Sequence, residues 1–193
     1  MYIIFDKLSK KIAPHMTFLT PNQITLGRFF LFIPLSFLCF LQGTYLFSIL
    51  GILLYGMFSL FDWVDGKVAK LRKMTSKKGE FLDTIIDRLG SRAVMLGMII
   101  FVFITTQSVL AWIFGFLLLL GCSLDDYVKL TGKLCKNDLV IDAHNYSLKS
   151  LLIPEYFLVA GTFLNMLPLF LIITMVFINI KWVWRAIKWW KTS

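Results

Sequence analysis

The sequence predicts an all-α membrane protein with six transmembrane helices preceded by a short interfacial amphipathic helix. Three observations lead to this fold class. Hydrophobic residues make up 58% of the 193 residues, and the mean hydropathy is +0.77, beyond the range of soluble domains. The apolar residues form runs close to the roughly 20 residues that cross a bilayer. Most of the Lys and Arg residues lie in or next to the connections on one side of these runs.

The N-terminal segment, residues 1–19, is expected to be a juxtamembrane amphipathic helix. Over residues 3–12, isoleucine and leucine recur at helical spacing opposite three lysines. This pattern is typical of a helix that lies in the headgroup layer. The alternative is a frayed tail on the cytoplasmic side.

The remainder, residues 20–193, is expected to be one six-helix domain. Thr20, Pro21 and Asn22 break the chain before its first apolar run, and proline is tolerated in the first turn of a helix. The six candidate spans are Ile24–Leu41, Tyr45–Phe61, Leu82–Phe103, Val109–Asp125, Leu151–Leu164 and Leu167–Ile187.

The connections between the spans predict the topology. Gln42–Thr44, Thr105–Ser108 and Asn165–Pro168 carry no charge, whereas Lys67–Lys78, Asp126–Ser150 and both termini are charged. The positive-inside rule therefore puts the termini and charged loops in the cytoplasm. The net charge of +9 is explained by this topology, and we expect no nucleic-acid partner.

Four aspartates at the cytoplasmic ends of the second and third spans are the candidate chemical site. Asp62 and Asp65 fall within one arc of the second span, and Asp83 and Asp87, four residues apart, share one stripe of the third. Carboxylates on consecutive helices can face each other, and divalent cations would relieve their repulsion. An all-oxygen site favours Mg²⁺ or Mn²⁺. The alternative is solvated helix-end acids, but acids inside apolar runs are usually functional.

Small residues share the helix faces that carry the carboxylates. They are Gly66 and Ala69 on the second span and Gly79 before the third. A residue without a bulky side chain lets a ligand lie against the helix backbone. Small residues also allow helices to pack closely in membranes, and the sequence leaves both interpretations open.

The string D-x2-D-G-x2-A-K-x8-G-x3-D-x3-D, from Asp62 to Asp87, resembles the signature of the CDP-alcohol phosphotransferase (CDP-alcohol phosphatidyltransferase) family. One position departs from the family pattern, because Lys70 stands where the family has arginine. Lysine keeps the positive charge but lacks the bidentate fork of a guanidinium. This departure bears on the geometry of pyrophosphate binding more than on the type of reaction.

The resemblance implies an enzyme that transfers a group from a CDP-linked donor to an acceptor hydroxyl and releases CMP, using two divalent ions. It makes Asp62, Asp65 and Asp83 the chief metal ligands. Asp87 would be the general base and share the second metal. The resemblance also implies a homodimer. The residues that would line the nucleotide are Gly66, Ala69, Lys70 and Gly79.

The acceptor is expected to be a polyol phosphate, either inositol phosphate or glycerol phosphate. Arg88, Arg92 and Lys129 are the candidate phosphate-binding cations, and the Asp87-Arg88 pair is similar to family members that use inositol phosphate. Arg88 and Arg92 lie roughly 140° from the carboxylate stripe on an ideal helix, so anchoring at the membrane interface is the alternative for both.

Three functions stay open for the sequence. The first is transfer of a phosphatidyl group from CDP-diacylglycerol to the polyol phosphate. The second is transfer of a phosphoalcohol from a soluble CDP-alcohol to a lipid such as diacylglycerol. The third is a catalytically silent scaffold, which the intact set of four aspartates disfavours.

Gly90, Ala93 and Gly97 could form a dimer surface or pack within one chain.

Overall fold

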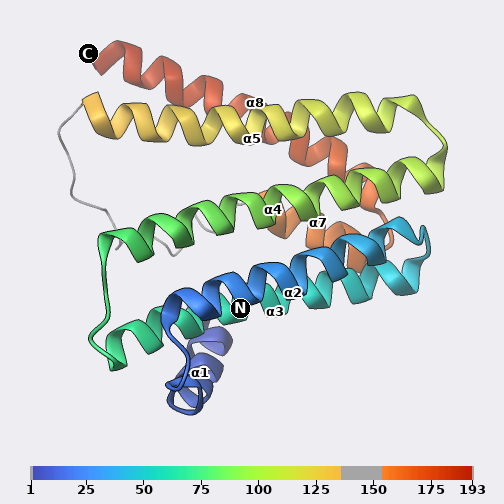
Figure 1. Ribbon diagram of the computed structural model, residues 1–193. Helices are drawn as coiled ribbons and strands as arrows, with labels where there is room; N and C mark the ends of the chain where they lie inside the picture. Colours follow the sequence, from blue (N-terminus) through green and yellow to red (C-terminus); the bar gives the residue numbers. More distant parts are fainter. Residues whose placement is uncertain (1, 136–153, 193) are drawn as a thin grey trace. The chain divides into compact units, whose positions relative to one another are not determined.

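The computed structural model describes residues 2–135 and 154–192, and every regular element within them is helical (Figure 1). The prediction of an all-α protein is therefore confirmed for the described residues. Two compact units divide the chain, Met1–Gly97 and Met98–Ser193. The elements are α1 (Tyr2–Ile12), η1 (Ala13–Met16), α2 (Pro21–Leu41), α3 (Tyr45–Leu71), α4 (Lys77–Thr106), α5 (Val109–Cys135), α7 (Pro154–Phe163) and α8 (Leu167–Thr192).

Five of the described helices are long and apolar enough to cross a membrane, namely α2, α3, α4, α5 and α8. This composition identifies an integral membrane protein. The predicted fifth span, Leu151–Leu164, begins outside the described residues and continues as α7, which has 10 residues. Such a helix is about 15 Å long, roughly half the thickness of the hydrocarbon core. Five of the six predicted spans are thus supported by the described residues.

The start of α2 follows the sequence prediction. Thr20 is the N-cap and Pro21 the first helical residue. The Thr20 hydroxyl accepts a hydrogen bond from the backbone N–H of Gln23 at 3.3 Å, and the Gln23 side chain accepts one from the Thr20 N–H at 2.8 Å. This reciprocal capping box satisfies two donors that the first turn would otherwise leave unpaired.

The turn between α3 and α4 is shorter than the apolar runs predict. α3 continues ten residues past Phe61 and ends at Leu71, while α4 starts at Lys77 instead of Leu82. Lysine, arginine and aspartate are compatible with helix, so polarity alone does not end either one. The four aspartates therefore stand on regular helix and not in a loop.

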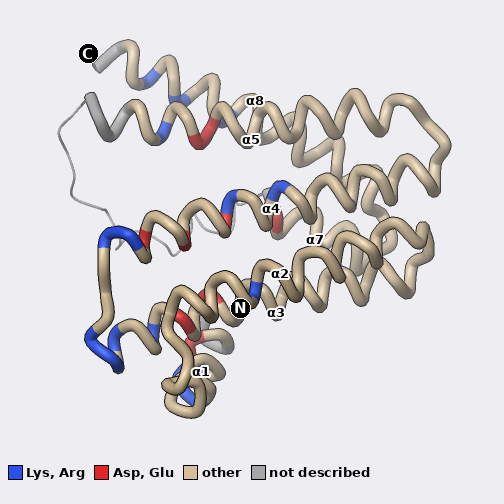
Figure 2. The backbone as a smooth tube through the Cα atoms, in the orientation of Figure 1, with Lys and Arg blue, Asp and Glu red and all other residues tan. Residues whose placement is uncertain are grey.

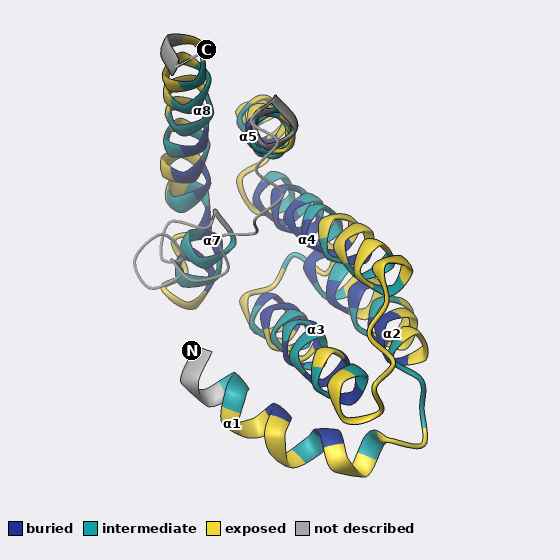
Figure 3. Ribbon diagram, turned by 90° about the vertical axis from the view of Figure 1, so that its left-hand side faces the viewer, coloured by how far each residue is buried: buried dark blue, intermediate teal, exposed yellow. Residues whose placement is uncertain are grey.

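The end of α3 is fixed by local backbone hydrogen bonds. Lys73 adopts the left-handed conformation, with φ of 54°, and the N–H groups of Lys73 and Met74 donate to the carbonyls of Lys70 and Ala69. This is a Schellman arrangement. Three residues later, the Ser76 hydroxyl accepts a hydrogen bond from the Gly79 N–H at 3.1 Å and caps α4. Exposed residues dominate this turn (Figure 3).

The first unit is held together by close contact of α2 and α3. The Ser36 hydroxyl donates to the Gly51 carbonyl at 2.8 Å, which brings the two backbones together at their uncharged ends. Towards the aspartates, Ile24 of α2 packs on Val64 and Val68 of α3, and Ala13 of η1 completes this buried cluster.

The helix α1 also docks on α3, through polar groups. Lys67 Nζ lies 2.8 Å from Asp6 Oδ1 and 2.5 Å from the Ser9 hydroxyl. Hydrogen bonds from Lys10 and Lys67 lower the pKa of the Asp6 carboxyl to about 2. The sequence predicted a helix here, and the helix is present. Its location at the membrane interface stays a prediction.

The second unit is built on the pairing of α5 with α8. Asn179 of α8 donates to the Leu117 carbonyl of α5 at 3.1 Å. A Cβ on Gly121 would lie 2.9 Å from the Asn179 side chain, so a larger residue there would displace the Asn179 amide. The contact aligns the ends of α5 and α8 that carry Asp125 and Arg185.

Candidate metal and nucleotide site

The four aspartates of the motif come together in the first unit, two from α3 and two from α4. Asp62, Asp83 and Asp87 each offer a carboxylate oxygen, and these oxygens lie within 4.8 Å of one another. Figure 2 shows these acids in the halves of α3 and α4 nearest their connecting turn, where Lys and Arg residues also gather. Hard, octahedral cations are bound by carboxylates in this way, so the donor set fits Mg²⁺ or Mn²⁺.

The fourth aspartate, Asp65, is placed differently. Its side chain is 6% exposed, whereas those of Asp62, Asp83 and Asp87 are 31%, 37% and 42% exposed. The Thr25 hydroxyl donates a hydrogen bond to Asp65 Oδ2 at 2.8 Å. The three carboxylates that a ligand can reach most easily are therefore Asp62, Asp83 and Asp87. The family resemblance implied Asp62, Asp65 and Asp83 as the chief ligands with Asp87 sharing the second metal, and this assignment stays a prediction.

An arginine from α2 contacts all four aspartates. The Arg28 side chain is fully buried and extends between α3 and α4. Nη2 of Arg28 lies 2.9 Å from Asp62 Oδ1, 2.6 Å from Asp83 Oδ1 and 2.8 Å from Asp87 Oδ1. Nε of the same guanidinium lies 3.4 Å from Asp65 Oδ2. One cation among four carboxylates leaves the cluster strongly anionic, so it can accept further positive charge.

Thr25 and Arg28 are site residues that the sequence interpretation missed. They stand three residues apart on the first span, so they share one face of α2. Arg28 lies five residues inside the predicted span Ile24–Leu41. A charge at that depth is itself a signal of function. Basic residues that are counted only as a topology signal do not reveal it.

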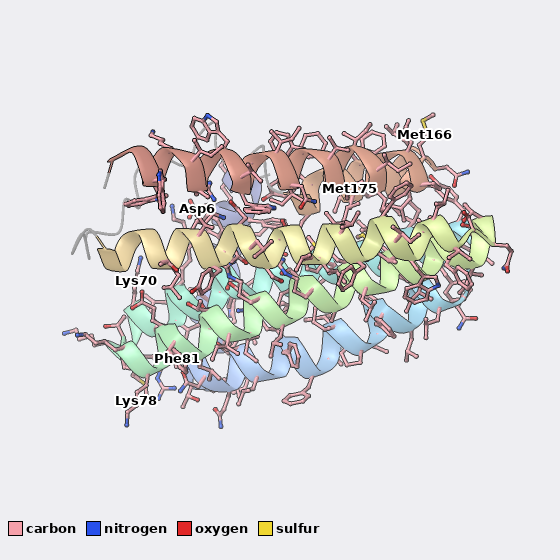
Figure 4. All side chains as sticks on the ribbon, turned by 90° about the horizontal axis from the view of Figure 1, so that it is seen from above. Asp6, Lys70, Lys78, Phe81, Met166 and Met175 are labelled. Carbon is pink, nitrogen blue, oxygen red and sulfur yellow. The ribbon has the colours of Figure 1, made fainter. Side chains whose placement is uncertain are left out.

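The small residues of the motif have two different surroundings. A Cβ added to Gly66 would meet no atom within 4 Å, whereas one on Gly79 would lie 3.2 Å from Ser76 Oγ and 3.3 Å from Asn22 Oδ1. Packing within the chain thus accounts for Gly79 but not for Gly66. Ala69 is half-buried and Lys70 exposed. Figure 4 labels Lys70 near the end of α3 and Lys78 near the start of α4, where its side chain points outward.

The candidate acceptor cations are spread over two helices. On α4, Arg88 is exposed and Arg92 half-buried. Lys129 lies on α5 in the second unit, where its ammonium group is 2.7 Å from Asp125 Oδ2 and 3.5 Å from Asp126 Oδ1. The structure thus gives Lys129 an ionic neighbourhood of its own.

That neighbourhood is a cluster of cations around one buried carboxylate. The Asp125 side chain is 3% exposed. The α8 residue Arg185 forms an ion pair with Asp125 Oδ1, and Lys181, also on α8, lies 4.0 Å from Oδ2. We call Asp125, Lys129, Lys181 and Arg185 the Asp125 cluster. The sequence interpretation named only Lys129, since Lys181 and Arg185 stood among the basic residues at the end of the last span.

The candidate dimer surface on α4 is used within the chain. A Cβ on Gly90 would lie 2.7 Å from Phe58 Cζ, and one on Gly97 would lie 3.1 Å from Phe40 Cδ2. Both glycines therefore receive aromatic side chains of the first unit. Of the two interpretations of these small residues, internal packing explains Gly90 and Gly97.

A family model described as CDP-alcohol phosphatidyltransferase matches residues 18–190, which is nearly the whole chain. The chain belongs to this family. The family assignment drawn from the motif between Asp62 and Asp87 is therefore confirmed. The match begins just before α2 and leaves α1 outside it.

Two curated relatives resemble parts of the chain. The archaetidylinositol phosphate synthase of Pyrococcus horikoshii is 33% identical over 116 residues, which are 60% of this chain and 56% of that protein. The bifunctional IPC transferase and DIPP synthase of Aquifex aeolicus is 32% identical over 83 residues, 42% of this chain and 18% of that protein. The matched part thus spans little more than half of the first relative and under a fifth of the second.

Solved structures resemble the chain over nearly its full length. The phosphatidylinositol phosphate synthase PgsA1 of Mycobacterium tuberculosis with bound CDP-DAG gives a TM-score of 0.74 at 17% identity, covering 97% of this chain and 94% of PgsA1. Its complex with manganese and citrate gives 0.75 at 17% identity, covering 96% and 88%. These two similarities show that this CDP-alcohol phosphatidyltransferase chain shares the PgsA1 fold.

Proposed function

We propose that the protein transfers a phosphatidyl group from CDP-diacylglycerol to a hydroxyl of inositol phosphate and releases CMP. The observation that carries this proposal is the convergence of Asp62, Asp83 and Asp87 from two helices to within 4.8 Å. A cluster of this kind is suited to hold divalent cations against a pyrophosphate. Membership of the CDP-alcohol phosphatidyltransferase family makes the donor a CDP-linked molecule.

The carboxylates have separate tasks in this reaction. Asp87 takes the proton from the acceptor hydroxyl, because its side chain is the most exposed of the four and a general base must reach its substrate. The acceptor oxygen forms a bond to the phosphorus that carries diacylglycerol, and the bond from that phosphorus to the oxygen of CMP breaks. Divalent ions, held by Asp62, Asp65, Asp83 and Asp87, would supply the positive charge that neutralises the pyrophosphate and the departing CMP.

The CMP part of the donor is proposed to lie along the motif face of α3. Gly66 supports this placement, because the space that its Cβ would fill contains no other atom of the chain within 4 Å. Ala69 and Lys70 follow on the same side, one turn closer to the end of α3. Gly79 would line the nucleotide from the start of α4. Lys70 would contact phosphate as a point charge where arginine would bind it with two parallel hydrogen bonds.

The choice of inositol phosphate as acceptor rests on the relatives and on the cations. Two similar proteins are named as synthases of inositol phosphate lipids. A phosphorylated acceptor needs cations for its phosphate, and we propose Arg88, Arg92 and Lys129 for this role. Within the Asp125 cluster, Lys181 and Arg185 accompany Lys129, which makes that group the strongest of the candidates.

We further propose a topology of six spans, with both termini and the aspartates on the cytoplasmic side and α1 in the headgroup layer. The charged α3–α4 turn supports this orientation. The predicted fifth span, Leu151–Leu164, lies partly outside the described residues. Cysteine labelling of α1, of the α3–α4 turn and of the C-terminus tests this topology, and labelling of the C-terminus from outside the cell would contradict it.

A homodimer is also proposed, for which the molar mass in detergent is the test.

One reconstitution tests the proposed reaction. Purified protein is incubated with Mg²⁺ or Mn²⁺ and CDP-diacylglycerol, and inositol phosphate, glycerol phosphate and inositol are offered separately. CMP release together with a lipid product should require the metal and inositol phosphate. Equal turnover with glycerol phosphate would contradict the acceptor but leave the reaction class intact. Turnover only with a soluble CDP-alcohol and diacylglycerol would contradict the donor.

A further inference from the structure

Arg28 is the least expected residue of the site, because it is a fully buried cation inside the first membrane span. Its Nη2 nitrogen lies 2.6 to 2.9 Å from Asp62, Asp83 and Asp87, the same three aspartates whose oxygens could hold a metal ion. A terminal guanidinium nitrogen carries only two hydrogens. Three carboxylates therefore share two donors, so at least one contact is ionic without a good hydrogen bond.

The rest of the guanidinium contacts an aromatic ring and, through Nε, the Asp65 carboxylate at 3.4 Å, but forms no hydrogen bond with the described residues. Arg28 Cζ lies 4.5 Å from the centre of the Phe58 ring, within cation–π distance. The Phe58 ring is itself pressed against α4 at Gly90, where a Cβ would lie 2.7 Å from Phe58 Cζ. Nη1 is buried and has no hydrogen-bond partner among the described residues. The guanidinium is thus well placed but incompletely satisfied.

The charge of the cluster is also incompletely balanced. Four carboxylates and one guanidinium sum to −4 + 1 = −3 if all are ionised. Two divalent ions would neutralise the four carboxylates without Arg28, since −4 + 4 = 0. Mg²⁺ binds carboxylate oxygens at about 2.0 to 2.1 Å, closer than the nitrogen of a guanidinium. It therefore competes with Nη2 for the oxygens of Asp62, Asp83 and Asp87.

We propose that Arg28 is an internal counter-cation of the metal site. It positions the four aspartates while the divalent ions are absent, and it gives up Asp62, Asp83 and Asp87 when the ions bind. Asp65, which Arg28 reaches through Nε and not Nη2, would remain its partner. Arg28 is thus a positioning residue that acts through the carboxylates. The inference rests on the proposed metal site and adds Arg28 as a competitor of the metal ions for its carboxylates.

Metal affinity tests this role, because a merely structural arginine would not compete with Mn²⁺. The full-length protein is purified in detergent as wild type, Arg28→Met and Arg28→Lys, and Mn²⁺ is titrated under electron paramagnetic resonance. Arg28→Met should bind Mn²⁺ at least about tenfold more tightly than wild type, because no cation has to be displaced, a change equivalent to ~1.4 kcal/mol. Arg28→Lys should lie between the two, since an ammonium lacks the planar fork.

Thermal unfolding gives an independent measurement on the same proteins. Arg28→Met should melt well below wild type in EDTA, where four carboxylates lose the guanidinium that contacts all of them. Saturating Mn²⁺ should remove most of that difference, because a ligand of the folded state stabilises it. A variant that folds only with Mn²⁺ would be the extreme form of this result. Arg185→Met, which also removes an arginine from an aspartate, is the control and should lose as much stability with Mn²⁺ as without.

Two results separate this inference from the metal assignment. If wild type binds Mn²⁺ and both Arg28 variants bind it equally or more weakly, Arg28 does not compete and the inference is wrong while the metal site stands. An equal loss of melting temperature with and without Mn²⁺ has the same meaning. If wild type binds no Mn²⁺ at all, the proposed metal site itself fails.

Discussion

Two ionic clusters in this protein have opposite compositions. In the first unit, four aspartates surround the single cation Arg28. In the second, the buried carboxylate of Asp125 contacts three cations, Lys129, Lys181 and Arg185, and a second carboxylate, Asp126, lies 3.5 Å from Lys129. Both clusters lie on helices that are otherwise apolar enough to cross a membrane. Charges are costly in such helices and are usually kept for function.

The composition of each cluster indicates what it can bind. Excess carboxylate attracts cations, so the aspartates are suited to divalent metals and to the pyrophosphate that the metals would hold. Excess cation attracts anions, so the Asp125 cluster is suited to a phosphate group. Within it, Asp125 holds the three cations in place and limits their mutual repulsion. Each cluster, taken by itself, is thus suited to a different chemical group.

The most direct test of the difference between the clusters is to remove one carboxylate from each. Asp83→Asn keeps the shape of the side chain but removes a metal ligand, and we expect CMP release to fall by more than about 10⁴-fold, or ~5 kcal/mol. Asp125→Asn should retain Mn²⁺ binding. CMP release with saturating Mg²⁺ and Mn²⁺ binding are the two measurements.

A different outcome would reverse the assignment of the two clusters. If Asp83→Asn keeps full activity in the presence of EDTA, the four aspartates do not act through a metal. If Asp125→Asn loses Mn²⁺ binding while Asp83→Asn retains it, the metal belongs to the second unit. Circular dichroism of each variant controls for folding.

A second comparison lies within the aspartate cluster, between exposed Asp87 and buried Asp65. Asp87→Asn should lower turnover by about 10²–10⁴-fold, the usual contribution of a general base, and still bind the CDP donor. Asp65→Asn should weaken donor binding, because Asp65 is a proposed metal ligand and the metals would hold the donor. Equal loss of CDP binding in both variants would make Asp87 mainly a ligand. The acceptor hydroxyl would then need another base.

The cations of the Asp125 cluster give the next smaller effect. Arg185→Gln should raise the KM for inositol phosphate by about 10- to 100-fold, the equivalent of one charged hydrogen bond of ~1.5–3 kcal/mol. The KM for CDP-diacylglycerol should not change. Lys129→Gln should act in the same direction. Arg88→Gln and Arg92→Gln are measured beside them, and a larger effect from either would move the acceptor phosphate to α4.

The sequence predicted most of the fold because the apolar runs are long and their breaks are chemically distinct. The first span starts at its proline and capping threonine as expected. The ends of α3 and α4 were misplaced by up to ten residues, because hydropathy marks the membrane and not the helix. The C-terminal end of α3 depends on the left-handed backbone conformation of Lys73. Lysine rarely adopts this conformation, so the sequence does not predict it. The span at 151–164 could be compared only in part.

The aspartates were predictable because each pair recurs at helical spacing inside an apolar run. Arg28 and Thr25 lie 34 and 37 residues before Asp62, the first residue of the motif, and their contact with the motif follows from the packing of α2 on α3. No local pattern encodes that contact. The same holds for Asp125 and Arg185, which are brought together by α5 and α8. The sequence does show that these charged residues stand inside apolar spans. It does not show which distant residues they contact.

Substituting glycines on α3 sharpens the distinction between ligand binding and packing. Gly66 and Gly56 both have open space where a Cβ would be, so alanine should be tolerated by the fold at either position. Gly66→Ala should weaken binding of the CDP donor by about tenfold, or ~1.4 kcal/mol, if the nucleotide lies against this face. Gly56→Ala, ten residues earlier on the same helix, should bind normally. Equal donor binding by both variants would place the nucleotide elsewhere.

The smallest effect is expected at Asp6, whose ion pairs lie outside both clusters. Its pKa is lowered to about 2 from 3.8, so its pairing with Lys10 and Lys67 stabilises the docked α1 above about pH 3.8. This stabilisation is lost as the pH falls from there towards 2. Asp6→Asn should remove it at every pH, so hydrogen exchange in α1 should become faster at neutral pH. Activity should change by less than about twofold, since surface pairs contribute little. A large loss of CMP release in Asp6→Asn would instead mean that α1 holds Lys67, and with it the motif face of α3, in its working position.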